Sequence, residues 1–380
     1  MELENQKNIS QVVETPDYAD VRDSFCKELR LATQEQATSL PFIHNAITTR
    51  SHIKTDEIFQ VFVIGGTNSE IATLRYNADK TISIIDYRVY PNMAKFESAA
   101  ALLKFIDKHV DDITNTIGIN FAFGLQPQIG NAGQMDGTMI GGDDKGHTFE
   151  DLRRQPVGET IEQYFMRIHN RPVTAAVAND IVCLIASVVD KEIDTSTLVA
   201  GIVGTGYNMA FFLDTKTIVN VQAAAFSGFK PTTTGHILDR ESSNIGAQLF
   251  EKEVAAGELY KHYNILAKQY HLEIDHISST KELSEIAGAN QHNEGDIARA
   301  LFKRSASLLA AQFAGFYNFK GRPRKLTAIM QGSLFWQGSD YKEVFVQELI
   351  ELGVPTEAIV FEALERSGII GITKLLTGTL

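Results

Sequence analysis

The chain has 380 residues, of which 44% are apolar and 22% charged, close to the average of soluble globular proteins. At about 150 residues per domain, this length predicts two or three domains. Asp and Glu outnumber Lys and Arg by 47 to 35, which gives a net charge of −12. This balance argues against nucleic-acid binding over a broad face, but not against a small anion held by backbone N–H groups.

The two cysteines, Cys26 and Cys183, are far apart, and no Cys/His cluster occurs. We therefore expect buried, reduced thiols of a cytoplasmic protein and no structural zinc site. Residues 1–18 are polar and lack the apolar core of a signal peptide. The longest apolar stretch, 173–189, contains Asn179 and Asp180 at its centre, which predicts a strand, a turn and a helix rather than a membrane span.

Short runs of β-branched and aromatic residues bounded by turn residues predict strands. The predicted strands are 59–64, 71–76, 82–87, 117–123, 173–178, 198–203, 209–213, 326–330 and 358–361. Apolar residues spaced three and four apart predict helices. The predicted helices are one through Val21, Phe25 and Leu29, then 96–113, a short one around 161–168, 181–189, most of 244–318, 341–352 and 369–376. Residues 124–148 are rich in Gly and Asp and are interpreted as a long loop of functional type.

The mixture of strands and helices along the whole chain predicts the α/β class. One pattern occurs twice: VFVIGGTNSEIATLRY (61–76) and VAGIVGTGYNMAFFL (199–213) both consist of an apolar strand, a Gly/Thr turn and a second apolar strand. The two segments begin about 140 residues apart. Two related βββαβα units would produce this duplication, and the period is too long for a solenoid.

The two glycine turns are candidate phosphate-binding loops. Glycine lets backbone N–H groups approach a phosphate, and threonine adds a hydroxyl donor. The alternative is a plain hairpin, because Gly and Asn are common turn residues. The candidates are Gly65, Gly66, Thr67 and Asn68 in the first turn and Gly204, Thr205 and Gly206 in the second. The chain has no GxxxxGK[ST] loop and no GxGxxG after a strand, which disfavours a P-loop enzyme and a dinucleotide fold.

Three other positions have two interpretations. Asp180 follows an apolar strand and precedes an apolar helix, so it is either a helix N-cap, a general base at a strand end, or both. Lys145, beside Asp143 and Asp144, belongs either to a solvated charge cluster or to a site that donates to substrate. Glu251 either faces solvent on a helix or pairs with two sugar hydroxyls.

These segments, in this order, resemble those of the hexokinase family over nearly the whole chain. Each match is short, and their order makes the resemblance specific. The matching segments are SLPF (39–42), IGGTN (64–68), NFAFG (120–124), DKGH (144–147), VANDIV (177–182), IVGTGYN (202–208), VNVQAAAF (219–226), ESSNIGAQLFEK (241–252), MQGSLF (330–335) and ERSGIIG (365–371).

The resemblance implies an α/β, two-lobed actin-like ATPase (ribonuclease H-like) fold of the hexokinase type. The large lobe would comprise 19–56 plus 180–365, and the small lobe 57–179 plus 366–380. The implied activity is the ATP-dependent phosphorylation of a hexose, with glucose expected, at its terminal hydroxymethyl group as the lobes close. The implied setting is cytoplasmic glycolysis and carbohydrate metabolism, with no nucleic-acid or membrane partner, as a monomer or homodimer.

The same resemblance assigns residue roles. Asp180 would be the general base, and Lys145, the second catalytic residue, would bind a sugar hydroxyl. The implied sugar-binding residues are Asp144, Asn179, Asn208, Gln222 and Glu251. The implied nucleotide-binding residues are Gly65, Gly66, Thr67, Asn68, Gly204, Thr205, Gly206, Gly332, Ser333, Ser367 and Gly368. Mg²⁺ would be held through the ATP phosphates, with no certain protein ligand.

The chain also departs from the family pattern. Val63 replaces an Asp that helps to hold Mg²⁺, Gln222 replaces a sugar-binding Glu, and Ala122 replaces a Ser. These departures keep two alternatives open. One is a catalytically impaired, hexokinase-like sugar-binding or regulatory protein, and the other is a kinase for a different acceptor, for example an amino sugar.

Overall fold

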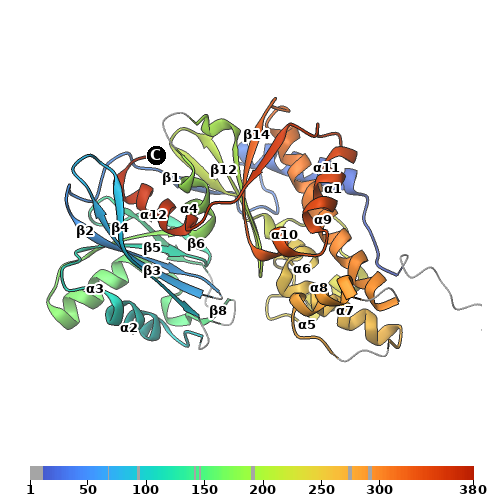
Figure 1. Cartoon of the computed structure of the whole chain (residues 1–380), viewed down its shortest axis with the longest axis horizontal. Coiled ribbons are helices and arrows are strands. Elements are labelled where there is room, and N and C mark those ends of the chain that lie inside the picture. The colour runs from blue at the N-terminus through green and yellow to red at the C-terminus, as the bar shows by residue number, and fades with distance from the viewer. Residues whose placement is uncertain are drawn as a thin grey trace, which may run out of the picture. The chain divides into compact units, whose positions relative to one another are not determined.

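The computed structural model describes residues 12–380 except 67, 92–94, 141–142, 145–146, 190–192, 273–275 and 290–292. Helices and strands are both present along the whole chain, and the strands of the described residues form two large mixed sheets and two small two-stranded sheets, so the α/β class is confirmed (Figure 1). Within the described residues, no helix is both long and apolar enough to cross a membrane. Cys26 and Cys183 are buried free thiols, as expected.

The chain divides into two compact units, each made of discontinuous segments. The first unit comprises 1–42, 201–209 and 221–363, and the second comprises 43–200, 210–220 and 364–380. The second unit therefore includes 43–56, 180–200 and 210–220, whereas the sequence predicts these segments in the lobe with 221–363. Two contacts explain this grouping. β1 (Ile43–Ala46) pairs with β13 (Thr217–Asn220), and a Cβ on Gly371 would overlap the Cys183 backbone.

The five-stranded sheet of the second unit has the order β10-β5-β2-β3-β4. Its strands are β2 (Ile58–Ile64), β3 (Asn68–Tyr76), β4 (Ile82–Pro91), β5 (Thr116–Phe121) and β10 (Thr174–Asn179). β2, β3 and β4 form an antiparallel meander, whereas β5 and β10 run parallel to β2. The three parallel strands therefore end at one edge of the sheet.

Helices cover both faces of this sheet. Phe62 and Ile119 belong to the apolar core shared with α2 (Ala99–His109) and α3 (Val157–His169). On the other face, a Cβ on Gly118 would approach Leu376 of α12 (Ser367–Thr377). α4 (Asp180–Ser187) packs beside α12, where Gly371 permits the close approach.

The second large sheet has the order β1-β13-β12-β11-β14-β15. Its other strands are β11 (Leu198–Val203), β12 (Tyr207–Asp214), β14 (Leu326–Gln331) and β15 (Ile359–Glu362). The run β15-β14-β11-β12-β13 repeats the arrangement of β10-β5-β2-β3-β4. The predicted duplication is therefore present in the strand order.

Several helices of the first unit pack against the long α9 (Asn293–Phe319). The first predicted helix is α1 (Tyr18–Thr33), and its Val21, Phe25 and Leu29 are buried. A Cβ on Gly315 would lie 2.6 Å from the Arg22 carbonyl oxygen, so α1 and α9 pack closely at this glycine. The remaining helices of this unit are α5 (Thr233–Glu241), α6 (Leu249–Val254), α7 (Ala256–Gln269), α8 (Thr280–Ala289), α10 (Ser333–Gln337) and α11 (Tyr341–Glu351).

Two predicted elements differ in the structure. The helix expected over 96–113 is only Ala99–His109, because Ser98 caps its N-terminus and the chain is extended at Val110. Residues 124–148 are not a long loop. They contain β6 (Leu125–Ile129) paired with β7 (Met135–Met139), and β8 (Asp143–Asp144) paired with β9 (His147–Thr148).

Candidate functional site

Asn179 and Asp180 lie at the carboxyl edge of the parallel strands. In the sheet register, Asn179 is opposite Phe121, which is opposite Ile64, so β10, β5 and β2 end side by side. Open α/β sheets bind ligands at this edge. Asp180 thus lies at a strand end, and its role as a base stays a prediction.

Asn179, rather than Asp180, is the N-cap of α4. Its Nδ2 donates to the carbonyl oxygens of Phe121 and Phe123, at 3.2 and 3.0 Å. Its Oδ1 accepts from Asn220 Nδ2 at 3.0 Å and from the Ile181 N–H at 3.4 Å. These bonds use both amide hydrogens of this buried side chain. They therefore fix the turn that presents Asp180.

Asp180 is the first residue of α4, and its Oδ1 accepts from the Ile181 N–H at 2.8 Å. A carboxylate in the first turn interacts favourably with the helix dipole. Cys183, one turn further on, is fully buried. Burial first, and the nearby charge of Asp180 second, raise the pKa of its thiol. Cys183 therefore stays neutral and is not a nucleophile.

The turn between β2 and β3 has the geometry of a tight hairpin. The Gly65 N–H donates to the Asn68 carbonyl oxygen at 3.1 Å. A Cβ on Gly65 would lie 2.8 Å from that oxygen, so the turn itself requires glycine here. Thr67, between the partly exposed Gly66 and the exposed Asn68, lies outside the described residues.

Val63, where the resemblance predicts a carboxylate, packs against the start of α12. A Cβ on Gly368 would lie 3.2 Å from Val63 Cγ2 and 2.7 Å from Asn120 Nδ2. Ser367 is buried beside it. The structure thus gives Gly368 a packing role at the ends of β2 and β5.

Asn120 is a residue of this edge that the sequence analysis did not assign. It is buried, and its Oδ1 has no hydrogen-bond partner within the described part of the chain. Its position beside Val63 makes this oxygen a candidate acceptor for water or a ligand. In the sequence, the signal that could have indicated Asn120 was its polar side chain near the end of an otherwise apolar strand, in NFAFG (120–124).

The second glycine turn, Gly204 to Gly206, belongs to the first unit. The Gly204 N–H donates to the Gly206 carbonyl oxygen at 3.0 Å. The carbonyl oxygens of Gly204 and Thr205 accept from Ala256 and Gly257, at 2.8 and 3.1 Å. The turn is thereby attached to the N-terminal end of α7, and Thr205 is exposed.

Glu251 and Gly332 both contact this turn. Glu251 Oε2 accepts from the Tyr207 N–H at 2.8 Å, so its carboxylate faces the turn rather than open solvent. Gly332 has a φ of 114°, and a Cβ there would overlap the Val203 carbonyl oxygen. The structure therefore brings Glu251 and Gly332 to the turn of Gly204, Thr205 and Gly206, and Ser333 follows Gly332 as the first residue of α10. Their binding roles stay predictions.

The remaining predicted residues are less fully placed. Asn208 is half-buried, and its Oδ1 accepts from the Met209 N–H at 2.8 Å. Gln222, also half-buried, has a left-handed conformation with φ 53°. Lys145 lies outside the described residues, and of Asp144 only the backbone, in β8, is described. Within the described residues, no group of three or more His, Cys, Asp or Glu could hold a metal ion.

The whole chain is similar in structure to hexokinases. A hexokinase from Schistosoma mansoni complexed with glucose superimposes with a TM-score of 0.75 at 18% identity, over 98% of this chain and 96% of that one. A second hexokinase crystal structure gives 0.67 at 16%, over 94% and 93%. A glucokinase from an Antarctic psychrotroph gives 0.54 at 16%, over 85% and 99%.

At these identities the likeness establishes the fold. The chain therefore has the hexokinase type of actin-like α/β fold, as the resemblance in sequence predicted. No protein-family model matches the sequence, and no curated protein matches it.

Proposed function

We propose that this protein is a sugar kinase that transfers the γ-phosphoryl group of ATP to the terminal hydroxymethyl group of a hexose, with glucose the expected acceptor. The observation that carries the proposal is Asp180. Its carboxylate lies at the carboxyl edge of three parallel strands, on a turn fixed by Asn179. The fold is that of hexokinases, and one of the similar structures holds glucose.

In this proposal, Asp180 takes the proton of the attacking hydroxyl. A general base has to lie within hydrogen-bond reach of that proton, and Asp180 is partly exposed at the strand edge. Asn208, Gln222 and Glu251 would bind other sugar hydroxyls, together with Asp144 and Lys145. Asn179 would position Asp180, because its own polar atoms are bonded within the protein.

The two glycine turns would hold the nucleotide phosphates. At Gly204, the nearest heavy atom to an added Cβ would be 3.7 Å away, so packing alone does not demand glycine there. A bound phosphate group would demand glycine at this position, because it needs a close approach to the backbone. Gly65, Gly66, Thr67 and Asn68 would act in the same way, and Gly332 and Ser333 would contact the nucleoside side.

MgATP supplies the phosphoryl group, and its Mg²⁺ neutralises phosphate charge during transfer. Val63 offers no carboxylate, so Mg²⁺ would be held by phosphate oxygens and its own waters, without the carboxylate that usually joins them in such sites. Ser367 and Gly368 would also contact the nucleoside side, and Gly368 in addition packs close to Val63 and Asn120.

The substitution Asp180→Asn tests the proposal. We expect kcat to fall about 10²–10⁴-fold, the usual contribution of a general base, with a smaller change in KM for the hexose. Asp17→Asn is the matched control, because Asp17 caps α1 and has no role in the proposed reaction. A coupled assay of hexose-dependent ADP formation measures both. Full activity in Asp180→Asn, or no transfer from any nucleotide to any hexose in the wild type, would contradict the proposal.

A second candidate function is hexose binding without turnover. Val63 favours it, because this side chain packs on α12 where the resemblance expects a magnesium carboxylate. This reading predicts a calorimetric binding signal for hexose with no ADP formation, and phosphoryl transfer that appears in Val63→Asp. Activity in the wild type that Asp180→Asn abolishes would exclude it.

A further inference from the structure

The strand β4 is an edge strand of the five-stranded sheet in the second unit, and most of its side chains are exposed or half-buried. It has ten residues, and within the described part of the chain only β3 pairs with it. Ile84, Ile85 and Val89 are 41, 52 and 50% exposed. A long edge strand with exposed aliphatic side chains is a template for pairing with another strand.

The residues of β4 are arranged almost symmetrically about Tyr87. Asp86 and Arg88 flank it with opposite charges, and Arg88 Nε lies 2.7 Å from Asp86 Oδ2. Aliphatic residues lie outside this pair on both sides. Tyr87 itself is held in place, because its hydroxyl donates to Glu70 at 3.0 Å and the Arg366 guanidinium lies 4.5 Å from its ring centre.

We propose that two copies of this chain associate through antiparallel pairing of their β4 strands, with a twofold axis through Tyr87. Asp86 of each copy then lies opposite Arg88 of the other, and Val89 lies opposite Ile84 and Ile85, where β4 has a bulge. Directly opposite residues in an antiparallel pair share a face and interact. The proposal is independent of the proposed function.

Other registers of the same pairing are less favourable. An axis through Asp86 or through Arg88 places like charges opposite each other, which is destabilising. An axis between Tyr87 and Arg88 is excluded, because directly opposite residues share a face, whereas neighbouring residues of one strand point to opposite faces. The Tyr87 register alone matches charge with opposite charge and aliphatic with aliphatic residues. A twofold pairing also uses the β4 edge of both copies. No β4 edge is then left for a third copy, so association stops at a dimer and does not grow into a fibre.

A disulfide trap tests the register. In Tyr87→Cys, the two new cysteines would face each other across the axis with Cα atoms about 4.5–5.5 Å apart, within the range of a disulfide. In the control Val89→Cys, the two new cysteines would be four residues out of register, about 13 Å apart along the strands. The wild type serves as a second control, because Cys26 and Cys183 are buried.

Under mild oxidation, we expect a reducible covalent dimer of Tyr87→Cys and none of Val89→Cys or the wild type. The absence of a covalent dimer in Tyr87→Cys, or an equal yield in both variants, would overturn the proposed register.

A charge exchange tests the same register without a covalent bond. Arg88→Asp would place acidic residues opposite each other at two positions, and we expect dimer affinity to fall about tenfold or more. The double variant Asp86→Arg with Arg88→Asp restores opposite pairs and should restore the affinity. Sedimentation velocity at several concentrations measures association, and the thermal unfolding midpoint confirms that each variant folds. A wild type that stays monomeric at every concentration, or a double variant that fails to recover, would overturn the proposal.

Discussion

Gly332 shows how a single residue connects two segments that are far apart in sequence. Its φ of 114° is a conformation that side-chain-bearing residues rarely adopt, and a Cβ there would overlap the Val203 carbonyl oxygen. The segment after β14 can therefore lie directly against the Gly204 to Gly206 turn. In the sequence, Gly332 was assigned to nucleotide binding by resemblance, whereas the structure adds a steric reason for glycine.

We expect Gly332→Ala to destabilise the protein by more than 2 kcal/mol, because strained backbone and a steric clash act together. The control is Gly246→Ala, where φ is 78° but no heavy atom lies within 4 Å of the added Cβ. Its cost should be about 1 kcal/mol, from backbone conformation alone. Urea unfolding measures both variants, and equal costs would contradict the steric explanation.

Val63 and Asn120 show the limit of reading single residues from sequence. The departure at Val63 was visible as a missing carboxylate, but its packing against Gly368 was not. Asn120 was hidden within an apolar strand, and only the structure reveals its buried oxygen, which has no hydrogen-bond partner among the described residues. Val63 and Asn120 both lie close to Gly368, which is far away in the chain. Rules based on residue spacing do not predict such contacts.

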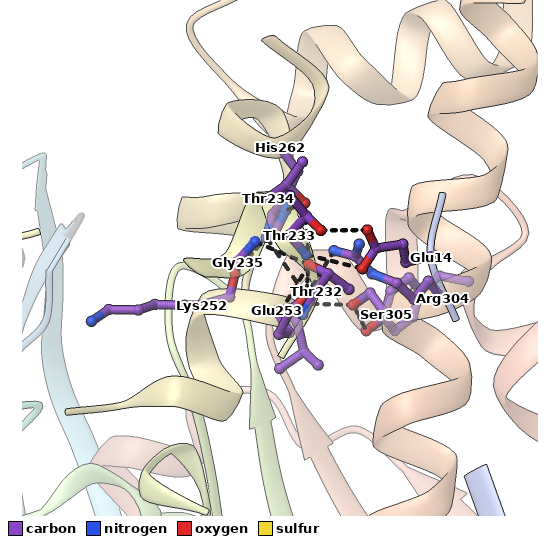
Figure 2. A network of polar contacts seen from close by, with 12 residues as sticks. Glu14, Thr232, Thr233, Thr234, Gly235, Lys252, Glu253, His262, Arg304 and Ser305 are labelled. Carbon is purple, nitrogen blue, oxygen red and sulfur yellow. Dashed lines mark hydrogen bonds and ion pairs between the residues drawn. The ribbon is translucent and has the colours of Figure 1, made fainter. Parts of the chain in front are cut away.

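At the scale of elements, a buried polar network joins α5, α6, α7 and α9 (Figure 2). Glu253 is fully buried, and its carboxylate accepts from the Thr232 N–H at 2.7 Å and lies 3.1 Å from Arg304 Nη2. Glu14 accepts from the Thr233 N–H at 3.0 Å, which ties the segment before α1 to the start of α5. Buried charges of this kind require such partners, because an unpaired one is strongly destabilising.

His262 is the neutral member of this network. Its Nε2 lies 2.7 Å from the Lys252 carbonyl oxygen, which only accepts, so Nε2 carries the proton. Its Nδ1 then accepts from the Thr234 hydroxyl at 2.6 Å. Burial first, and the positive charge of Arg304 second, lower the pKa of His262 to about 4.

This pKa predicts acid sensitivity. An unfolded histidine titrates near pH 6.5, so the unfolded state gains a proton before the folded state does. The stability contributed by neutral His262 is full above pH 6.5 and is lost as the pH falls towards 4. At pH 5 the loss should be about 2 kcal/mol.

The substitution His262→Gln keeps a donor for the Lys252 carbonyl oxygen and removes the titration. Urea unfolding of wild type and variant at pH 7 and pH 5 measures the difference between their acid losses. We expect the variant to lose about 2 kcal/mol less than the wild type over this interval. Parallel losses in the two proteins would contradict a neutral buried histidine.

At the scale of the whole molecule, the net charge of −12 opposes the approach of a nucleotide polyphosphate. Salt screens this repulsion. We therefore expect KM for MgATP to fall about twofold between roughly 10 and 100 mM ionic strength, while KM for the uncharged hexose stays constant. Steady-state kinetics at fixed free Mg²⁺ measures both. A KM for MgATP that rises with salt would instead indicate a positive local field at the nucleotide site.

The sequence by itself determined the α/β class, most strands, the first helix and the order of the glycine turns, because hydrophobic periodicity and turn residues are local signals. The duplicated strand pattern was also visible, and the strand orders confirm it. Local signals failed at 124–148, where few branched apolar residues occur. This segment is instead held by contacts with distant residues: the Asp136 carboxylate accepts from the N–H groups of Gly158 and Glu159 at the start of α3.

Only the tertiary structure decided which residues share a location. It made Asn179 rather than Asp180 the helix cap, placed Glu251 on the Gly204 to Gly206 turn, and packed Gly368 on Val63. It also left β4 as an exposed edge. These outcomes depend on steric fit and hydrogen bonds between segments distant in the chain. Such contacts leave no periodic pattern in the sequence from which they could be predicted.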